Sequence, residues 1–408
     1  MNFRRLALLT STMAFSSMVH AADADVENED IQALRDWINS KRMITVRELG
    51  GQLSISGEAR AEMQATAETL NGEALRGRGK DLPTNTYDAE FNLSIDYRTE
   101  NTWAAARIKF DNDAGIINDN FGSGSNQKIK VDKAYFGYRL IDGDRHTMDV
   151  EVGRRGMFLL FDSKLQFASN FDGASFKDTY AIDKVGDLYY QVGVFLVNER
   201  KDQAAYVGEC GILNVANTGF YTKYSLIDWD TKDNVSIPQQ FHFIISQLSM
   251  GYKFIPQPWD KVVNIYLAGL YNHRARRLEV SNRQLANYGG YVGFSIGQIK
   301  QEGDWSFDAN YQVLAAQCVP DFDVLGIGLG NSPGVGYYYT KGKDKLTENT
   351  AKDAQGGVNY RGFRFALQYM LTNNLNIYQE WAQSITLDNH IGPFRRYKQY
   401  EVELIYAF

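Results

Sequence analysis

Apolar and polar residues alternate along several long segments of this chain. The pattern runs through residues 52–65, 87–98 and 304–315, where hydrophobic or small residues occupy every second position. Successive side chains of a β-strand point to opposite faces, so each segment predicts a strand with one apolar face and one polar face. At about twelve residues, these strands exceed the roughly five to six of a soluble sheet. They suit the roughly nine to eleven that a tilted strand needs to cross a bilayer.

The connections between the predicted strands alternate between short and long. Tight turns at residues 99–101, 300–304 and 372–374 alternate with polar stretches at 66–86, 112–127, 273–286 and 316–356. Short turns on one side and long loops on the other are typical of bacterial outer-membrane barrels, which have even strand counts. About sixteen strands fit, and the alternation is weakest in the two that start at Tyr206 and Thr218. The starts lie near Gln52, Tyr87, Thr102, Ile129, Thr147, Asp172, Leu188, Tyr206, Thr218, Gln240, Val262, Asn287, Asp304, Gly357, Leu375 and Tyr397.

The alternation also predicts what lies inside the sheet. In lipid, every backbone N–H and C=O group must be paired within the protein, so only helices and closed barrels cross a bilayer. Here the apolar positions would face lipid and the charged positions would line a lumen wide enough for water. The final stretch "YEVELIYAF" is an amphipathic strand that would close the barrel against the first one. We therefore predict an all-β fold, a transmembrane antiparallel β-barrel over residues 52–408.

Residues 1–51 differ from the rest of the chain. Arg4 and Arg5 precede a short apolar run and a small-residue cleavage site that ends at Ala21, so residues 1–21 are predicted to be a secretory signal peptide. Its removal would take two of the 43 basic residues and no acidic one, changing the net charge from −6 to −8. That charge gives no electrostatic basis for binding nucleic acid. Residues 22–51 show helical spacing and predict a short periplasmic helix that caps the barrel, tethers it to the envelope or helps to form a trimer.

These features resemble those of bacterial outer-membrane general porins. The closing strand is similar to the signature that the outer-membrane assembly machinery reads in that class, with Tyr400, Val402, Leu404 and Tyr406 ahead of Phe408. The segments "VDKAYFGYRL" and "MDVEVGRRGM" look like the fourth and fifth strands of those porins. The N-terminal helix is instead similar to porin-like proteins of the chlamydial group. The resemblance implies a cell outer-membrane location, a homotrimer and a channel for passive diffusion of ions and small hydrophilic solutes.

In that family the third outward loop folds into the barrel and narrows it. The matching loop here is residues 157–171, whose apolar run at 158–161 would otherwise be exposed to water. We expect Asp162 and Lys164 to face the aperture and to meet Arg60, Arg107 and Arg155. The alternative is that this stretch extends the two flanking strands.

Strand phase predicts that bases and acids are mixed on the inner wall. Opposed charges across a pore give a weak net preference, so we expect weak ion selectivity. Besides the three arginines, the predicted wall charges are Lys109, Lys133, Glu58, Glu62, Glu90 and Glu151. Aromatic residues near the strand ends predict girdles at the two membrane interfaces, namely Tyr87, Tyr97, Trp103, Tyr138, Trp305 and Tyr406.

Other functions have weaker support in the sequence. The glycine-rich "GIGLGNSPG" lacks the Lys-Ser/Thr of a phosphate loop, the histidines have no metal-ligand spacing, and no Gly-x-Ser-x-Gly motif is present. We therefore expect neither an enzyme nor a cofactor or metal. Cys210 and Cys318 could pair with each other or with other chains in an oxidising envelope, or stay free thiols. A substrate-selective channel for sugars or anions, and a structural or adhesive surface barrel, remain alternatives to the diffusion porin.

Overall fold

The computed structural model of the protein describes residues 51–78, 80, 83–114, 127–198, 203–230, 243–257, 259–275, 277, 284–320, 323–327, 357–389 and 394–408. The predicted signal peptide and N-terminal helix lie outside these residues. Regular structure in the described part is β-strand, apart from one short 3-10 turn. No helix within it is long and apolar enough to span a lipid bilayer.

Sixteen long strands and one two-residue strand make up a single sheet. The two-residue strand, β2, lies in the connection between the first two long strands. In chain order the strands are β1 (Gln52–Leu70), β2 (Glu73–Ala74), β3 (Asn85–Arg98), β4 (Thr102–Ala114), β5 (Gln127–Asp142), β6 (His146–Gly156), β7 (Asn170–Ile182), β8 (Gly186–Asn198), β9 (Gln203–Val215), β10 (Phe220–Trp229), β11 (Phe243–Phe254), β12 (Val263–Asn272), β13 (Tyr288–Gly297), β14 (Trp305–Leu314), β15 (Tyr360–Met370), β16 (Leu375–Thr386) and β17 (Arg395–Ala407).

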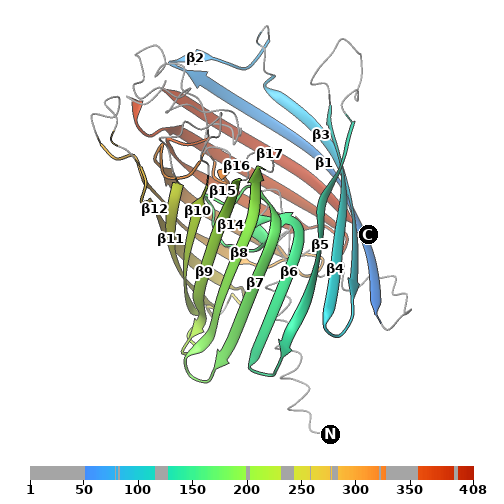
Figure 1. Ribbon diagram of the computed structural model, residues 1–408. Helices are drawn as coiled ribbons and strands as arrows, with labels where there is room; N and C mark the ends of the chain where they lie inside the picture. Colours follow the sequence, from blue (N-terminus) through green and yellow to red (C-terminus); the bar gives the residue numbers. More distant parts are fainter. Residues whose placement is uncertain are drawn as a thin grey trace.

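The sheet closes on itself to form an antiparallel barrel (Figure 1). Each long strand pairs with its sequence neighbours, and β17 pairs with β1 from Glu58↔Ala407 to Leu70↔Arg395. The predicted closure is thus confirmed, and all sixteen predicted strand starts lie within three residues of the observed ones. Some loop boundaries were wrong. Residues 66–70, predicted as loop, continue β1, because their backbone remains paired with β17. Residues 85–86 and 112–114, also predicted as loop, belong to β3 and β4.

Tight turns and long connections lie at opposite ends of the barrel. The turns β3–β4, β5–β6 and β7–β8 gather at the lower end in Figure 1, and the connections at the upper end are mostly longer. The longest connection joins β14 to β15 and spans residues 315–359. Cys210 and Cys318 are both free thiols in this chain, so they do not form a disulfide with each other.

The two faces of the barrel have the predicted polarity. Tyr400, Leu404, Tyr406 and Phe408 are exposed on the outer face of the closing strand, and Glu403 on the same strand is buried toward the lumen. Ile405, which breaks the alternation in the sequence, packs inside against Ala366 and Tyr378.

One predicted girdle residue faces the other way. The Trp103 indole N–H donates to Glu151 Oε1 at 2.9 Å, inside the barrel. Trp103 lies four positions before Arg107 and six before Lys109, and side chains separated by an even number of positions along a strand point to the same face. The outer face keeps Tyr87, Tyr138, Trp305 and Tyr406 as exposed aromatics.

Candidate functional site

The chain between β6 and β7 crosses the interior of the barrel (Figure 1). We call residues 157–169 the lumen loop; it begins with the 3-10 turn Met157–Leu159. The Gln247 side chain of β11 donates to the Asp162 carbonyl at 2.6 Å and accepts from the Ser163 hydroxyl at 2.6 Å. Strand β11 lies four strands beyond β7 around the barrel. These bonds place the loop in the lumen, so the alternative that it extends its flanking strands is wrong.

Apolar packing holds the lumen loop against one side of the inner wall. Met157, Phe161 and Leu165 are almost fully buried and belong to the same cluster as Trp229 of β10 and Phe243 of β11. A fully buried large side chain contributes roughly 1.5–3 kcal/mol relative to exposure, so these three outweigh any single polar contact of the loop. The apolar run at 158–161 therefore packs the loop against a hydrophobic region of the inner wall, as its sequence predicts.

Two ion pairs attach the charged residues of the loop to the same wall. Lys223 Nζ of β10 lies 2.7 Å from Asp162 Oδ2, and this cation lowers the pKa of Asp162. Lys164 Nζ lies 3.5 Å from Asp308 Oδ2 of β14 and 4.8 Å from the centroid of the Tyr266 ring. These contacts differ from the predicted ones to Arg60, Arg107 and Arg155. The loop crosses toward β10–β14, because its apolar residues find their cluster there.

A buried carboxylate from the longest connection fixes the far end of the loop. Asp323 accepts the backbone N–H of Phe167 at 3.0 Å and that of Ser169 at 3.0 Å. The Leu325 N–H donates to the Leu165 carbonyl at 3.1 Å beside them. Phe167 has φ +80°, a left-handed conformation that is costly for a bulky residue and persists only where its surroundings impose it. Asp323 is therefore the residue that holds this turn.

The anchor should depend on pH. Burial raises the pKa of Asp323 to about 7, and the two N–H donors offset part of the rise. Because the pKa in the docked state exceeds the usual carboxyl value of about 4, docking favours the protonated form. This contribution to stability is complete below about pH 4 and is lost as the pH rises through 7.

We therefore expect the lumen loop to open more often at pH 8 than at pH 5. The measurement is the frequency of conductance fluctuations in single-channel recordings at the two pH values. Asp323→Asn removes the titrating group, so its recordings should lose this difference. Equal pH dependence in wild type and in Asp323→Asn would contradict the assignment.

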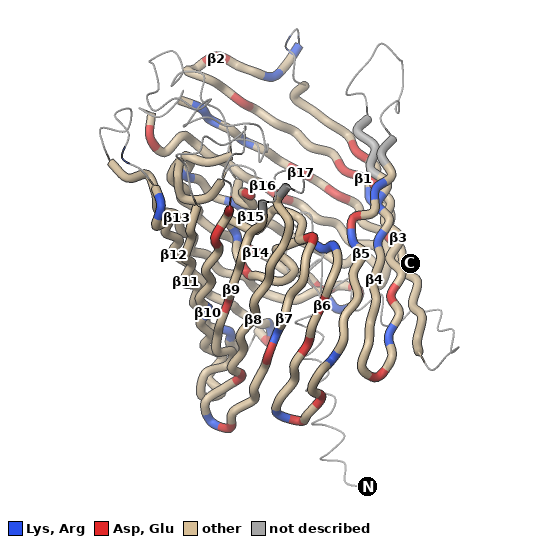
Figure 2. Tube along the Cα trace, in the orientation of Figure 1, with Lys and Arg blue, Asp and Glu red and all other residues tan. Residues whose placement is uncertain are grey.

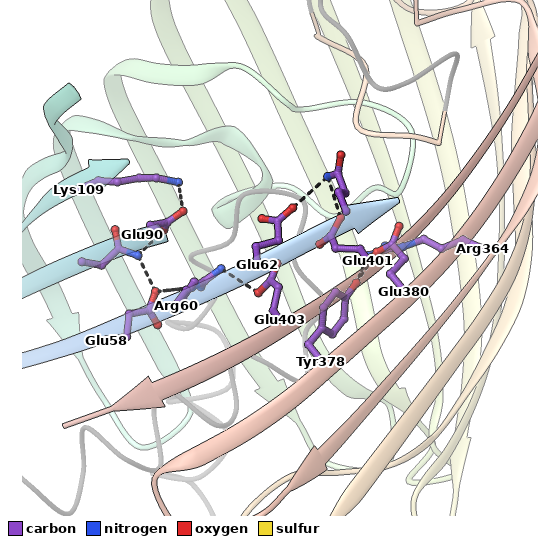
Figure 3. A network of polar contacts seen from close by, with 12 residues as sticks. Glu58, Arg60, Glu62, Glu90, Lys109, Arg364, Tyr378, Glu380, Glu401 and Glu403 are labelled. Atoms are coloured by element: carbon purple, nitrogen blue, oxygen red, sulfur yellow. Dashed lines mark hydrogen bonds and ion pairs between the residues drawn. The ribbon is translucent and has the colours of Figure 1, made fainter. Parts of the chain in front are cut away.

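A network of charges lies where β1 meets β17 and β3 (Figure 3). Arg60 Nη2 lies 2.9 Å from Glu58 Oε1, and Arg60 Nη1 lies 3.6 Å from Glu403 Oε2. Lys109 of β4 lies 2.6 Å from Glu90. These side chains project into the lumen from adjacent strands, as strand phase predicts, and each base has an acid beside it.

A β-bulge between β4 and β5 brings a second group of charged side chains to the inner wall. The β4–β5 register skips Asp132, so Asp132 and Lys133 both turn toward the inner wall. Arg107 Nε donates to Asp132 Oδ2 at 2.9 Å. Arg155 of β6 forms an ion pair with Glu151, and its guanidinium lies 4.6 Å from the Tyr135 ring centroid.

Acids dominate the opposite side of the Figure 3 network. Carboxylate oxygens of Glu62, Glu401 and Glu403 lie within 4.8 Å of one another, the one such group of possible metal ligands in the described ranges. Gln64 Nε2 donates to Glu62 at 3.0 Å and to Glu401 at 3.1 Å. Carboxylates about 5 Å apart repel by roughly 1 kcal/mol in water, so this corner concentrates negative potential.

Acids and bases are interspersed along both walls of the barrel (Figure 2). Several lumen charges were not singled out in the sequence: Asp132, Lys223, Asp308, Asp323, Arg364 and Glu380. Lys223, Asp308, Arg364 and Glu380 have the inward strand phase that would have identified them. Asp132 depends on the bulge, and Asp323 lies outside any strand.

No protein-family model matches the chain, and no curated protein matches it. Among solved structures the barrel is similar to OprB of Pseudomonas putida, with 13% identity, a TM-score of 0.51 and coverage of 87% of this chain and 94% of OprB. It also matches the outer-membrane channel DcaP of Acinetobacter baumannii, with 10% identity, a TM-score of 0.47 and coverage of 90% and 99%. A mutant porin of Rh. blastica matches with 12% identity, a TM-score of 0.44 and coverage of 87% and 100%. The match to OprB shows a shared barrel fold, and the resemblance to the chlamydial group stays a prediction.

Proposed function

We propose that this protein is an outer-membrane porin, a water-filled channel for passive diffusion of ions and small hydrophilic solutes. The main support for this proposal is that the inner wall of the barrel is lined with charged side chains and that the lumen loop crosses the interior. A soluble barrel would bury apolar residues inside and expose polar ones, whereas this barrel exposes Leu404 and Tyr406 and turns Arg60 and Glu403 inward.

Weak ion selectivity belongs to the same proposal. The residues that we assign to the constriction and its walls are Asp162, Lys164, Arg60, Arg107, Lys109, Lys133, Arg155, Glu58, Glu62 and Glu90. Most of the bases lie beside an acid, for example Lys109 beside Glu90. Paired charges leave little net potential beyond their immediate surroundings, which disfavours strong selection by sign.

Reconstitution into a planar bilayer tests the proposal. A diffusion porin gives discrete, long-lived conductance steps that increase in proportion to salt concentration. Steps blocked by one sugar or anion at saturating concentration would favour a substrate-selective channel. A bilayer that stays silent with correctly folded protein would favour a structural or adhesive surface barrel.

We further infer that three copies associate in the membrane. The outer face of β1 supports this, because Ala59, Ala61 and Ala67 are exposed there and small side chains let two surfaces approach closely. Chemical crosslinking in native membranes should give a ladder that ends at three chains.

The closing strand is the proposed signal for the assembly machinery, and Phe408 also has a structural role. Its backbone exchanges two hydrogen bonds with Gly57, both 2.9 Å long. The ring lies over Gly57, where a Cβ would approach Phe408 Cζ to 2.5 Å, and its centroid lies 6.0 Å from that of Phe91. Aromatic pairs of this kind contribute roughly 0.5–1.5 kcal/mol beyond their buried area.

Deleting Phe408 should therefore impair both recognition and closure. We expect poor assembly and periplasmic degradation, measured as the loss of heat-modifiable barrel in isolated outer membranes. Phe408→Tyr keeps the ring and serves as the matched control, with near-normal levels expected. Wild-type levels of the deletion variant would rule out this role.

A further inference from the structure

Three cations lie on the outer face of the barrel near the ends of two strands. Arg361 follows the first residue of β15, and Arg396 and Lys398 lie near the start of β17. All three are exposed, and they alternate with buried Tyr360, Gly362 and Tyr397 that point inward. We call Arg361, Arg396 and Lys398 the basic patch. It lies at the end of the long connections, which face the outside in barrels of this kind.

The basic patch is compact. Arg361 is in register with Ile385, which is in register with Arg396, so the two arginines are two strands apart. That spacing is about 10 Å, and Lys398 lies about 7 Å along β17 from Arg396. Three positive charges thus share an area similar to that of one lipid headgroup.

No described acid neutralises the basic patch. Within the described residues, none of the three cations has an ion pair, whereas neighbouring Arg395 turns inward and pairs with Glu68 at 2.7 Å. The outward positions beside the cations are also uncharged: Gln383 and Ile385 on β16, and Ala67 and Thr69 on β1. The positive charge of the basic patch is therefore accessible to an anionic ligand from outside the chain.

An aromatic surface lies directly beside the basic patch, toward the middle of the barrel. The Phe363 and Trp381 rings are 4.9 Å apart, and Phe365 stacks on Trp381 at 5.6 Å with an interplanar angle of 7°. Tyr400 is in register with Trp381 on the other side. Aromatic rings at this depth pack against the upper part of acyl chains, just below a headgroup.

We propose that the basic patch and this aromatic surface bind one phosphate-bearing lipid of the outer leaflet. Its phosphates would contact Arg361, Arg396 and Lys398, and its acyl chains would lie over Phe363 and Trp381. Arginine suits this ligand because its planar fork donates two hydrogen bonds to one phosphate. This site is on the outside of the barrel and is independent of the channel.

A lipid titration tests the proposal. The full-length protein in a neutral detergent is titrated with an acylated diglucosamine lipid bearing two phosphates, and with the same lipid after removal of its phosphates. We expect preference for the phosphorylated form. Each cation near a charged membrane contributes about fivefold in binding, so R361Q/R396Q/K398Q should weaken it about a hundredfold.

Matched variants separate a site from a general charge effect. R98Q/K184Q/K300Q removes three exposed cations at the opposite end of the barrel and should bind the lipid as wild type does. The charge-preserving R361K/R396K/K398R should retain most of the affinity, which also guards against misfolding of the neutral variant. The proposal would be overturned if both neutral variants lost lipid affinity equally, or if neither lost any. It would also be overturned if inorganic phosphate competed for the protein as well as the phosphorylated lipid does. A change of oligomeric state in R361Q/R396Q/K398Q without loss of lipid binding would instead assign the patch to a second copy of the chain.

Discussion

Replacing Asp323 with alanine is expected to release the lumen loop and to raise single-channel conductance. The carboxylate accepts the N–H groups of Phe167 and Ser169, both at 3.0 Å. The substitution would leave two buried donors without an acceptor, at a cost of about 1–3 kcal/mol each. Even a loss of about 3 kcal/mol shifts the ratio of open to docked loop by roughly two orders of magnitude. Phe167 would then be free to leave its left-handed conformation.

Asp304→Ala provides a matched control for that experiment. Asp304 also accepts two backbone N–H groups, those of Lys300 and Gln301 at 3.0 Å, but it does so in the β13–β14 turn outside the lumen. This variant should lower thermal stability without changing conductance. Deleting residues 162–166 should reproduce the higher conductance of Asp323→Ala. If both lumen-loop variants form heat-modifiable barrels with wild-type conductance, the loop is not the constriction.

Neutralising Arg60 and Arg107 together is expected to shift the channel toward cations. A fixed unit charge about 5 Å from a passing ion changes its energy by about 0.8 kcal/mol in water, roughly a fourfold change in local ion concentration. Removing Arg60 leaves Glu58 and Glu403 without this partner, and removing Arg107 does the same to Asp132. Glutamine is preferable to glutamate here, because a new carboxylate beside Glu58 would strain the fold. The measurement is the zero-current potential of R60Q/R107Q in a salt gradient.

A charge-balanced variant is the control for this prediction. R60Q/R107Q/E58Q/D132N removes two acids together with the two bases, so its zero-current potential should return toward the wild-type value. The shift in R60Q/R107Q should also shrink at high salt, since screening shortens the reach of each charge. An unchanged potential in the double variant would remove these arginines from the selectivity filter.

The strand pattern was readable from the sequence because each strand carries its own signal. Period-2 alternation depends on residues that are neighbours in the chain, so strand phase placed Arg60, Arg107 and Glu90 on the inner wall. Trp103 was wrongly assigned to the outer face by its residue type, whereas its strand phase, which it shares with Arg107, gives the observed inward direction. Strand phase missed Asp132, because a bulge adds a residue that the pattern does not contain.

The contacts of the lumen loop could not be predicted in the same way. Its apolar run indicated that the loop was packed, but nothing local indicated which wall would receive it. Lys223 and Asp308 become partners of Asp162 and Lys164 only because the apolar cluster around Trp229 and Phe243 lies on that side. The bond from Phe167 to Asp323 joins residues 156 positions apart, a separation at which local patterns carry no information.

That separation has a consequence for the order of folding. The lumen loop finds one anchor in β10 and β11 and the other in the segment that follows β14, so its final position requires most of the barrel to exist first. Contacts between distant residues form late, because the intervening chain must lose its freedom before they contribute. The barrel is therefore expected to form with a wide interior and to narrow in a separate, slower step. A refolding experiment would then show closure of the sheet by circular dichroism before the docking of Phe161 and Phe167.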